Sequence, residues 1–101
     1  MKTIANIPAE WKNISDLFVA LGDEHRQRIL LSFDREERLN IRQIVENSKL
    51  GRTAVTHHLK VLHYSGALKS EKVGKEVFFW LDRQFMTDNI QAVLTYIQEE
   101  I

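Results

Sequence analysis

Three histidines lie close together in residues 53–65, which read TAVTHHLKVLHYS. Histidine can bind a metal, form hydrogen bonds or change its charge near neutral pH. A metal site on one helix needs ligands three or four residues apart, because this spacing places two side chains on the same face. No pair among His57, His58 and His63 has that spacing, and the chain contains no cysteine. We therefore predict no metal ion and no other cofactor.

The same residues have the apolar spacing of an amphipathic helix that begins near Arg52, runs to Ser65 and stops at Gly66. Val55, Leu59 and Leu62 define its buried face, and His58 lies on the flank of that face. The opposite face carries short hydrogen-bonding groups and a cation, contributed by Thr53, Thr56, His57 and Lys60. Such a face suits the major groove of DNA, which accepts a helix and displays donors and acceptors. An ordinary solvated face would have a similar composition.

Other helices are predicted on both sides of this one. Apolar spacing predicts a first helix over about residues 8–21, closed by Gly22, and a second over residues 24–33, capped by Asp23. A short third helix should run from about residue 41 to 47, with Asn40 as its cap and Gln43 as the capping partner. Only about four residues then precede the histidine-containing helix, which is the connection length of a helix-turn-helix.

A β-hairpin should follow, because two short runs, 67–73 and 75–81, are joined around Gly74, and β-branched and aromatic residues concentrate in the second. Lys69, Lys72 and Lys75 lie on it and could bind phosphates beside the groove. Alternatively, Lys69 and Lys75 only keep a strand edge soluble. The fold class predicted is mainly α with a small β-hairpin. It is a winged helix-turn-helix of about five helices and a two- to three-stranded wing, in a single domain over residues 1–101.

The charge distribution agrees with a nucleic-acid partner, although the net charge of the chain is zero. Residues 41–81 carry seven Lys and Arg against three Asp and Glu, a net charge of +4. The flanking segments 1–40 and 82–101 have net charges of −1 and −3. A basic segment between neutral or acidic ones is expected of a DNA-binding element held by scaffold helices.

At this point the chain resembles the ArsR/SmtB family of bacterial winged-helix transcriptional regulators. ALGDEHRQRIL at 20–30 is similar to the family's second helix, GRTAVTHHLKVLHYSGAL at 51–68 to its recognition helix, and KSEKVGKEVFFWL at 69–81 to its wing. The resemblance covers about residues 10–98 and implies DNA binding. In the family pattern, an HL pair before the leucine-rich end of the helix matches His58 and Leu59, and the residue before this pair varies and faces DNA. This implication agrees with the helical projection of His57.

The chain departs from the family pattern where family members bind their inducers. The stretch RLNIRQI lacks the cysteine pair that thiophilic-metal sensors carry. The last helix offers Asp88, Glu99 and Glu100 but no histidine for a zinc-type site between paired helices. The resemblance therefore leaves the effector unknown.

The last helix has more apolar surface than one core contact requires. Met86, Ile90, Val93, Leu94, Ile97 and Ile101 form an aliphatic stripe, and Phe85 and Tyr96 form a separate aromatic flank. Either a partner covers the surplus or the small domain buries both internally. The resemblance implies a homodimer that pairs the first and last helices, about residues 8–21 and 84–99. The expected interface residues are Trp11, Ile14, Phe18, Ile90, Val93, Leu94 and Ile97.

The preferred hypothesis is a cytoplasmic, homodimeric repressor that reads a pseudo-palindromic operator in double-stranded DNA through the 52–65 helix and the 68–81 wing. Arg52 and Lys60 of the helix, with Lys72 and Lys75 of the wing, should contact phosphates. Thr53, Thr56 and His57 should contact base edges. The alternative is a winged helix that docks on an acidic protein. We predict no catalytic residues, because no nucleophile has a poised base. No signal peptide or membrane segment is evident in the sequence.

Overall fold

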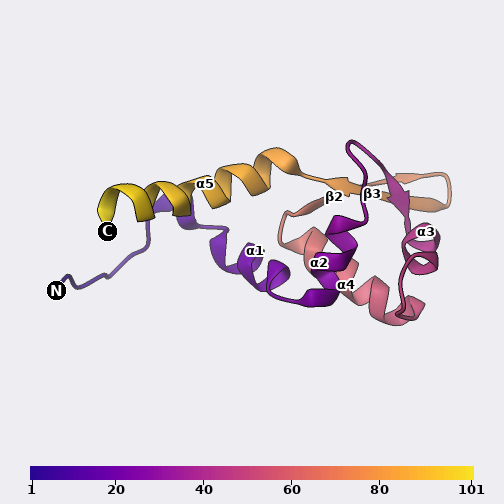
Figure 1. Cartoon of the computed structure of the whole chain (residues 1–101). Coiled ribbons are helices and arrows are strands. Elements are labelled where there is room, and N and C mark those ends of the chain that lie inside the picture. The colour runs from indigo at the N-terminus through magenta and orange to yellow at the C-terminus, as the bar shows by residue number, and fades with distance from the viewer.

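The computed structural model describes residues 1–101, which form five α-helices, one 3₁₀ helix and three strands (Figure 1). In chain order these elements are η1 (Ala9–Trp11), α1 (Ile14–Leu21), α2 (Glu24–Leu31), β1 (Leu39–Asn40), α3 (Ile41–Glu46), α4 (Arg52–Tyr64), β2 (Leu68–Val73), β3 (Glu76–Leu81) and α5 (Arg83–Glu100). The predicted fold class, a winged helix-turn-helix, is confirmed. None of the helices is long and apolar enough to cross a membrane.

The prediction of one continuous helix over residues 8–21 is wrong. The 3₁₀ helix η1 ends at Trp11, and α1 begins separately at Ile14 after Asn13. The segments before and after the break pack against different parts of the chain. Trp11 packs edge-on against Tyr96 of α5, with ring centroids 5.4 Å apart, whereas Leu17 and Ala20 of α1 enter the main core. A straight helix would not direct both segments to these positions.

The helix-turn-helix consists of α3 and α4, and its predicted caps and buried face are confirmed. Asn40 and Gln43 form the capping box, in which each side chain accepts a hydrogen bond of 2.9 Å from the backbone N–H of the other residue. Val55, Leu59 and Leu62 of α4 are almost completely buried. They pack with Leu17 and Ile29 in a cluster to which all of the first four α-helices contribute, so the core fixes the rotation of α4 about its axis.

The wing is a three-stranded antiparallel sheet in the order β1-β3-β2. Lys69 lies opposite Trp80 in the register of β2 and β3, and Ser70 lies opposite Phe79. Phe79 is buried against the core, so the face that carries Ser70 and Phe79 points inward, and the face that carries Lys69 and Trp80 points outward. Alternate residues of each strand therefore meet different surroundings.

Two turns in this region require glycine. Gly74 closes the hairpin with φ of 63°, and Gly66 ends α4 with φ of 91°, a region that L side chains rarely adopt. A Cβ atom at Gly66 would also lie only 2.5 Å from the ring of Phe85. The two residues of the aromatic flank expected on the last helix therefore pack within the same chain. Phe85 lies against Gly66, and Tyr96 contacts Trp11.

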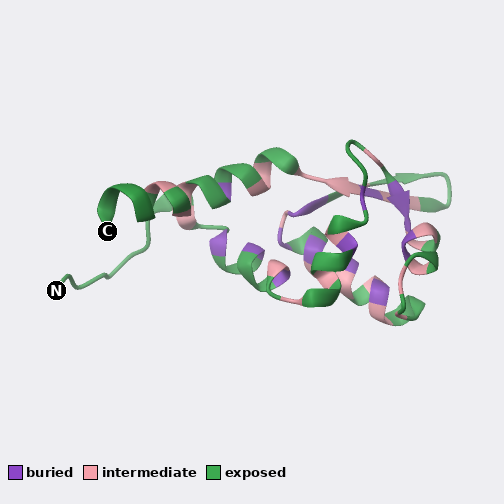
Figure 2. Cartoon of the chain, in the orientation of Figure 1, coloured by how far each residue is buried: buried purple, intermediate pink, exposed green.

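The helix α5 leaves the core and extends alongside the N-terminal segment (Figure 1). The molecule measures 52 × 22 × 21 Å, and its radius of gyration is 15.8 Å, whereas about 13 Å is usual for a compact domain of this length. The only buried residue of α5 is Asn89. Figure 2 shows the outer turns of this helix mostly as exposed surface, and Ile90, Leu94 and Ile97 each expose more than two fifths of their area.

Candidate nucleic-acid interface

The exposed face of α4 gathers five of the predicted DNA-binding residues into one shallow hollow of about 410 Å³. Its lining consists of Arg52, Thr53, Thr56, His57 and Lys60, without any hydrophobic residue. Thr56 is half-buried, and the other four are exposed. The rotation of α4 that buries Leu59 is therefore the rotation that presents hydrogen-bonding groups and two cations to solvent.

The three predicted wing lysines do not share one environment. Lys72 and Lys75 are exposed near the end of the hairpin and take part in no ion pair. Lys69 lies on the outward face of the sheet, and its Nζ is 3.7 Å from a carboxylate oxygen of Asp82. Lys72 lies three positions after Lys69 on β2 and so faces the other side of the sheet, and Lys75 lies in the turn between β2 and β3.

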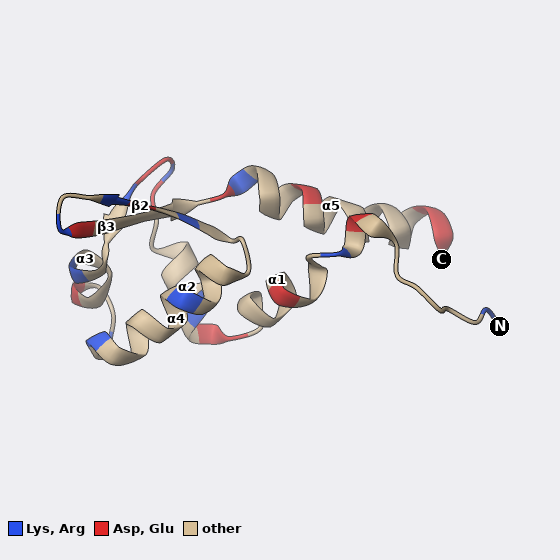
Figure 3. Ribbon diagram, turned by 180° about the vertical axis from the view of Figure 1, so that it is seen from behind, with Lys and Arg blue, Asp and Glu red and all other residues tan.

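Other charges on the outward face of the wing are also paired. The guanidinium of Arg38 lies 3.8 Å from the ring centroid of Trp80 and 3.1 Å from Glu71. These contacts satisfy Arg38 locally, whereas Lys72 and Lys75 retain their full attraction for an external anion. Figure 3 shows Lys and Arg on α4 and around the hairpin, whereas α5 beyond its first turn carries only acidic charges.

The three histidines of α4 have three different roles. His57 is exposed in the hollow. His63 has its Nε2 3.1 Å from the hydroxyl of Ser70, and so connects α4 to the wing. His58 lies between helices, with ring centroids 5.6 Å from His57 and 5.7 Å from His25. No three His, Asp or Glu side chains are placed to hold a metal ion.

His58 is held by Arg26, a residue to which the sequence pattern assigned no role. Nη1 of Arg26 donates a hydrogen bond of 3.2 Å to Nδ1 of His58. The same guanidinium donates to the backbone oxygens of Ala20 and Val19, at 2.9 and 3.0 Å, and so caps the end of α1. Burial lowers the pKa of His58 below its usual value, and the positive charge of Arg26 acts in the same direction. One arginine thus connects α1, α2 and the recognition helix.

Asp23 begins this connection at the N-terminus of α2. Its carboxylate accepts hydrogen bonds from the backbone N–H groups of His25 and Arg26, at 2.9 and 3.1 Å. The bond from Arg26 is the main reason that the pKa of Asp23 lies below its ordinary value. The predicted cap of the second helix is confirmed.

The residues expected at a dimer interface divide into two groups. Ile14 is already buried within its own chain, and Trp11 is partly covered by Tyr96. Phe18, Ile90, Leu94 and Ile97 are exposed, and Val93 is half-buried. Among the expected interface residues, those left open to a partner are therefore mainly Ile90, Leu94 and Ile97 of α5 and Phe18 of α1.

The sequence profile of the family described as bacterial regulatory protein, arsR family, matches residues 23–70, which include the helix-turn-helix, β1 and the start of β2. Over this segment the chain is similar to the ArsR family. Its members are DNA-binding transcriptional regulators and not enzymes. The match contains the Asp23 cap, Arg26 and all of α4.

Individual relatives agree with this similarity. The transcriptional repressor SmtB homolog of Synechocystis sp. is 26% identical over 88 residues, which are 87% of this chain and 66% of that protein. Among solved structures, an ArsR-like transcriptional regulator from Rhodococcus sp. superposes with a TM-score of 0.81 at 23% identity, covering 91% of this chain and 86% of the other. The transcriptional repressor PagR of Bacillus anthracis gives 0.65 at 22% identity, covering 82% and 93%. At these identities the structural likeness shows the fold.

Proposed function

We propose that this protein is an ArsR-family regulator, a homodimeric repressor that reads a pseudo-palindromic operator with α4 and holds the flanking backbone with its wing. The observation that supports it best is the face of α4, where five polar or basic side chains form a surface without apolar residues. Two copies related by a two-fold axis would place two such helices in major grooves about 34 Å apart, one turn of DNA.

Each side chain of this surface has a role that follows from its chemistry. Arg52 and Lys60 flank the hollow and bind phosphates, because their long cationic side chains reach beyond the helix. Thr53, Thr56 and His57 contact base edges with short donors and acceptors. Lys72 and Lys75 bind phosphates beside the groove. Lys69 joins them only after leaving Asp82, so its contribution is the smallest of the three wing lysines.

The homodimer is supported by the unpartnered aliphatic stripe on α5. Ile90, Leu94 and Ile97 are exposed on a helix that extends away from the core. A second copy placed against the same stripe would bury these residues and make a more compact assembly. Repression is supported by the names of two relatives, the SmtB homolog and PagR, both of which are described as repressors.

Selection of duplexes from a random pool, with the full chain as bait, tests this function. We expect an enriched inverted repeat with half-sites about 10 base pairs apart. Titration of the selected duplex at several salt concentrations should give a linear fall of log affinity with log salt, with a slope of about −0.9 per phosphate contacted. Absence of duplex binding at low salt would contradict the proposal and favour docking of the basic surface on an acidic protein.

A further inference from the structure

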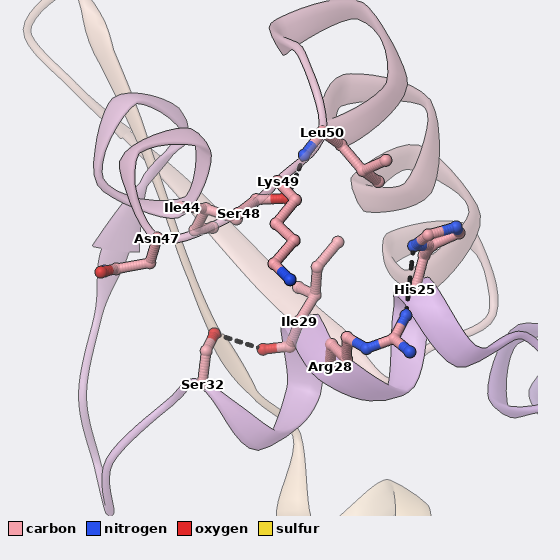
Figure 4. Close-up of a pocket in the computed structure, with 9 residues that line it drawn as sticks. All are labelled: His25, Arg28, Ile29, Ser32, Ile44, Asn47, Ser48, Lys49 and Leu50. Carbon is pink, nitrogen blue, oxygen red and sulfur yellow. Dashed lines mark hydrogen bonds between the residues drawn. The ribbon is translucent and has the colours of Figure 1, made fainter.

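A separate cavity of about 350 Å³ lies between α2 and the turn that joins α3 to α4 (Figure 4). Its apolar part comes from Ile29 and Ile44, which are buried, and from Leu50, which is half-buried. Cavities of about this size, with an apolar lining and a few polar groups, are typical of small-molecule sites. The cavity does not include any residue of the α4 hollow.

The charges around this cavity all have the same sign. Arg28 and Lys49 line it from opposite elements, together with His25, and no acidic residue lines it. Figure 4 shows the side chain of Lys49 extending from the α3–α4 turn toward α2. Lys49 takes part in no ion pair. Arg28 lies 4.0 Å from the exposed Glu24, and its Nη1 donates a hydrogen bond of 3.4 Å to Nδ1 of His25. Both contacts of Arg28 are long and leave the rest of its guanidinium open, so the two cations are available to a ligand.

We propose that this cavity binds a small organic anion, a carboxylate with a short aliphatic or aromatic body, and that the bound anion lowers the affinity for DNA. The carboxylate would lie between Lys49 and Arg28, and the body would contact Ile29, Ile44 and Leu50. Such a ligand matches the cavity because its charged end meets the two cations and its apolar body meets the apolar side chains. A neutral molecule of the same shape would leave both cations without a partner.

The effect on DNA rests on the function proposed above and follows from the position of the cavity. The α3–α4 turn leads directly into Arg52, the first residue of the recognition helix. Within this turn the backbone N–H of Leu50 donates a hydrogen bond of 3.0 Å to the hydroxyl of Ser48. A carboxylate beside this turn offsets one of the two positive charges of Lys49 and Arg28 and so weakens the attraction of this region for DNA phosphates. By linkage, DNA must weaken the binding of the anion by the same factor.

The first experiment measures ligand binding to the free protein, without DNA. Benzoate is the probe, and benzamide is the neutral control of nearly the same shape. In NMR titrations of the full chain, benzoate should give saturable shifts of the backbone amides of Ser48, Lys49 and Leu50, whereas benzamide should not saturate. Lys49→Gln and Arg28→Gln should each weaken benzoate binding about tenfold, the loss expected for one charge-assisted hydrogen bond. Lys2→Gln removes a distant positive charge and should bind benzoate as the wild type does.

The second experiment measures DNA binding with and without the probe. At constant ionic strength, benzoate should weaken binding of the selected duplex by the wild type and leave binding by Lys49→Gln almost unchanged. Duplex binding without benzoate tests the proposed function separately, so the two proposals fail in different assays. Non-saturating benzoate shifts overturn the site. So does equal binding of benzoate and benzamide. A third result would also contradict the proposal. If benzoate does not bind the wild type, and both glutamine variants show a smaller salt slope of duplex binding, then Lys49 and Arg28 contact DNA phosphates instead.

Discussion

The guanidinium of Arg26 donates a hydrogen bond to Nδ1 of His58 across 3.2 Å, and this bond joins the first turn of α2 to the recognition helix. Arginine is always protonated in proteins and can only donate, so Nδ1 of His58 accepts and the imidazole is neutral. The neighbouring His57 is exposed and has no such partner. Two adjacent histidines therefore serve different purposes, one structural and one on the candidate DNA-binding face.

Replacement of His58 should lower stability. We expect His58→Ala to reduce the free energy of unfolding by about 1–3 kcal/mol, because it removes packing and leaves a hydrogen-bond donor of Arg26 without its partner. The matched variant His57→Ala should change it by less than about 0.5 kcal/mol, as exposed substitutions usually do. Urea denaturation of both variants measures the difference, and equal effects would contradict the distinction.

The lowered pKa of His58 predicts that stability falls in weakly acidic solution. Above its ordinary pKa of 6.5, His58 is neutral in both the folded and the unfolded chain. As the pH falls below 6.5, the unfolded chain binds a proton that the folded chain does not yet bind, so the free energy of unfolding decreases. Urea denaturation between about pH 7.5 and about pH 5 should show this decrease in the wild type. The slope should be smaller in His58→Gln, which lacks this proton-binding group. Asp23, whose pKa is lowered from 3.8, would act only at lower pH.

His57 should matter for specific DNA binding. We expect His57→Ala to weaken binding of the selected operator by about 1–3 kcal/mol per half-site, the value of one lost base contact. Binding of random duplex should change little, because base contacts carry sequence information and phosphate contacts do not. Fluorescence anisotropy with both duplexes measures the two affinities. A parallel loss on both duplexes would instead assign His57 to the backbone.

The wing lysines should contribute without sequence preference. Replacing Lys72 and Lys75 together by alanine should weaken binding to all duplexes alike and reduce the magnitude of the salt slope by about 2, one for each phosphate contact. Lys69→Ala is the matched comparison and should have a smaller effect, because its Nζ is 3.7 Å from Asp82. A changed sequence preference with an unchanged slope would contradict this role.

A charge in the aliphatic stripe of α5 should disrupt the dimer. Ile97 is 52% exposed in the single chain, so Ile97→Glu should leave the monomer folded but place a carboxylate in the proposed interface. Sedimentation should show a dimer for the wild type and a monomer for Ile97→Glu, and operator binding should be lost with it. Gln98→Glu adds the same charge to an exposed neighbouring position and should remain dimeric. A wild type that is monomeric at micromolar concentration would rule out this arrangement.

Local patterns in the sequence determined much of the fold. The apolar spacing of Val55, Leu59 and Leu62 predicted both the helix and its buried face, because a repeat of 3.6 residues relates sequence position directly to helix face. Asn40 and Gln43 predicted the start of α3, since a capping box needs only residues three apart. Gly66 and Gly74 marked the ends of α4 and β2 for a similarly local reason, their positive φ angles.

Features that depend on partners distant in the sequence appeared only in the tertiary structure. The break between Trp11 and Ile14 follows from the contact of Trp11 with Tyr96, 85 positions further along the chain by their numbers. Lys69 is paired and Lys72 is free, because the register of the sheet assigns them to opposite faces. No local pattern distinguishes Arg26 or Lys49 from the other cations of the sequence. Packing of α2 against α3 and α4 brings Arg26 to His58 and places Lys49 on the same cavity as Arg28, and such long-range packing has no periodic signal in the chain.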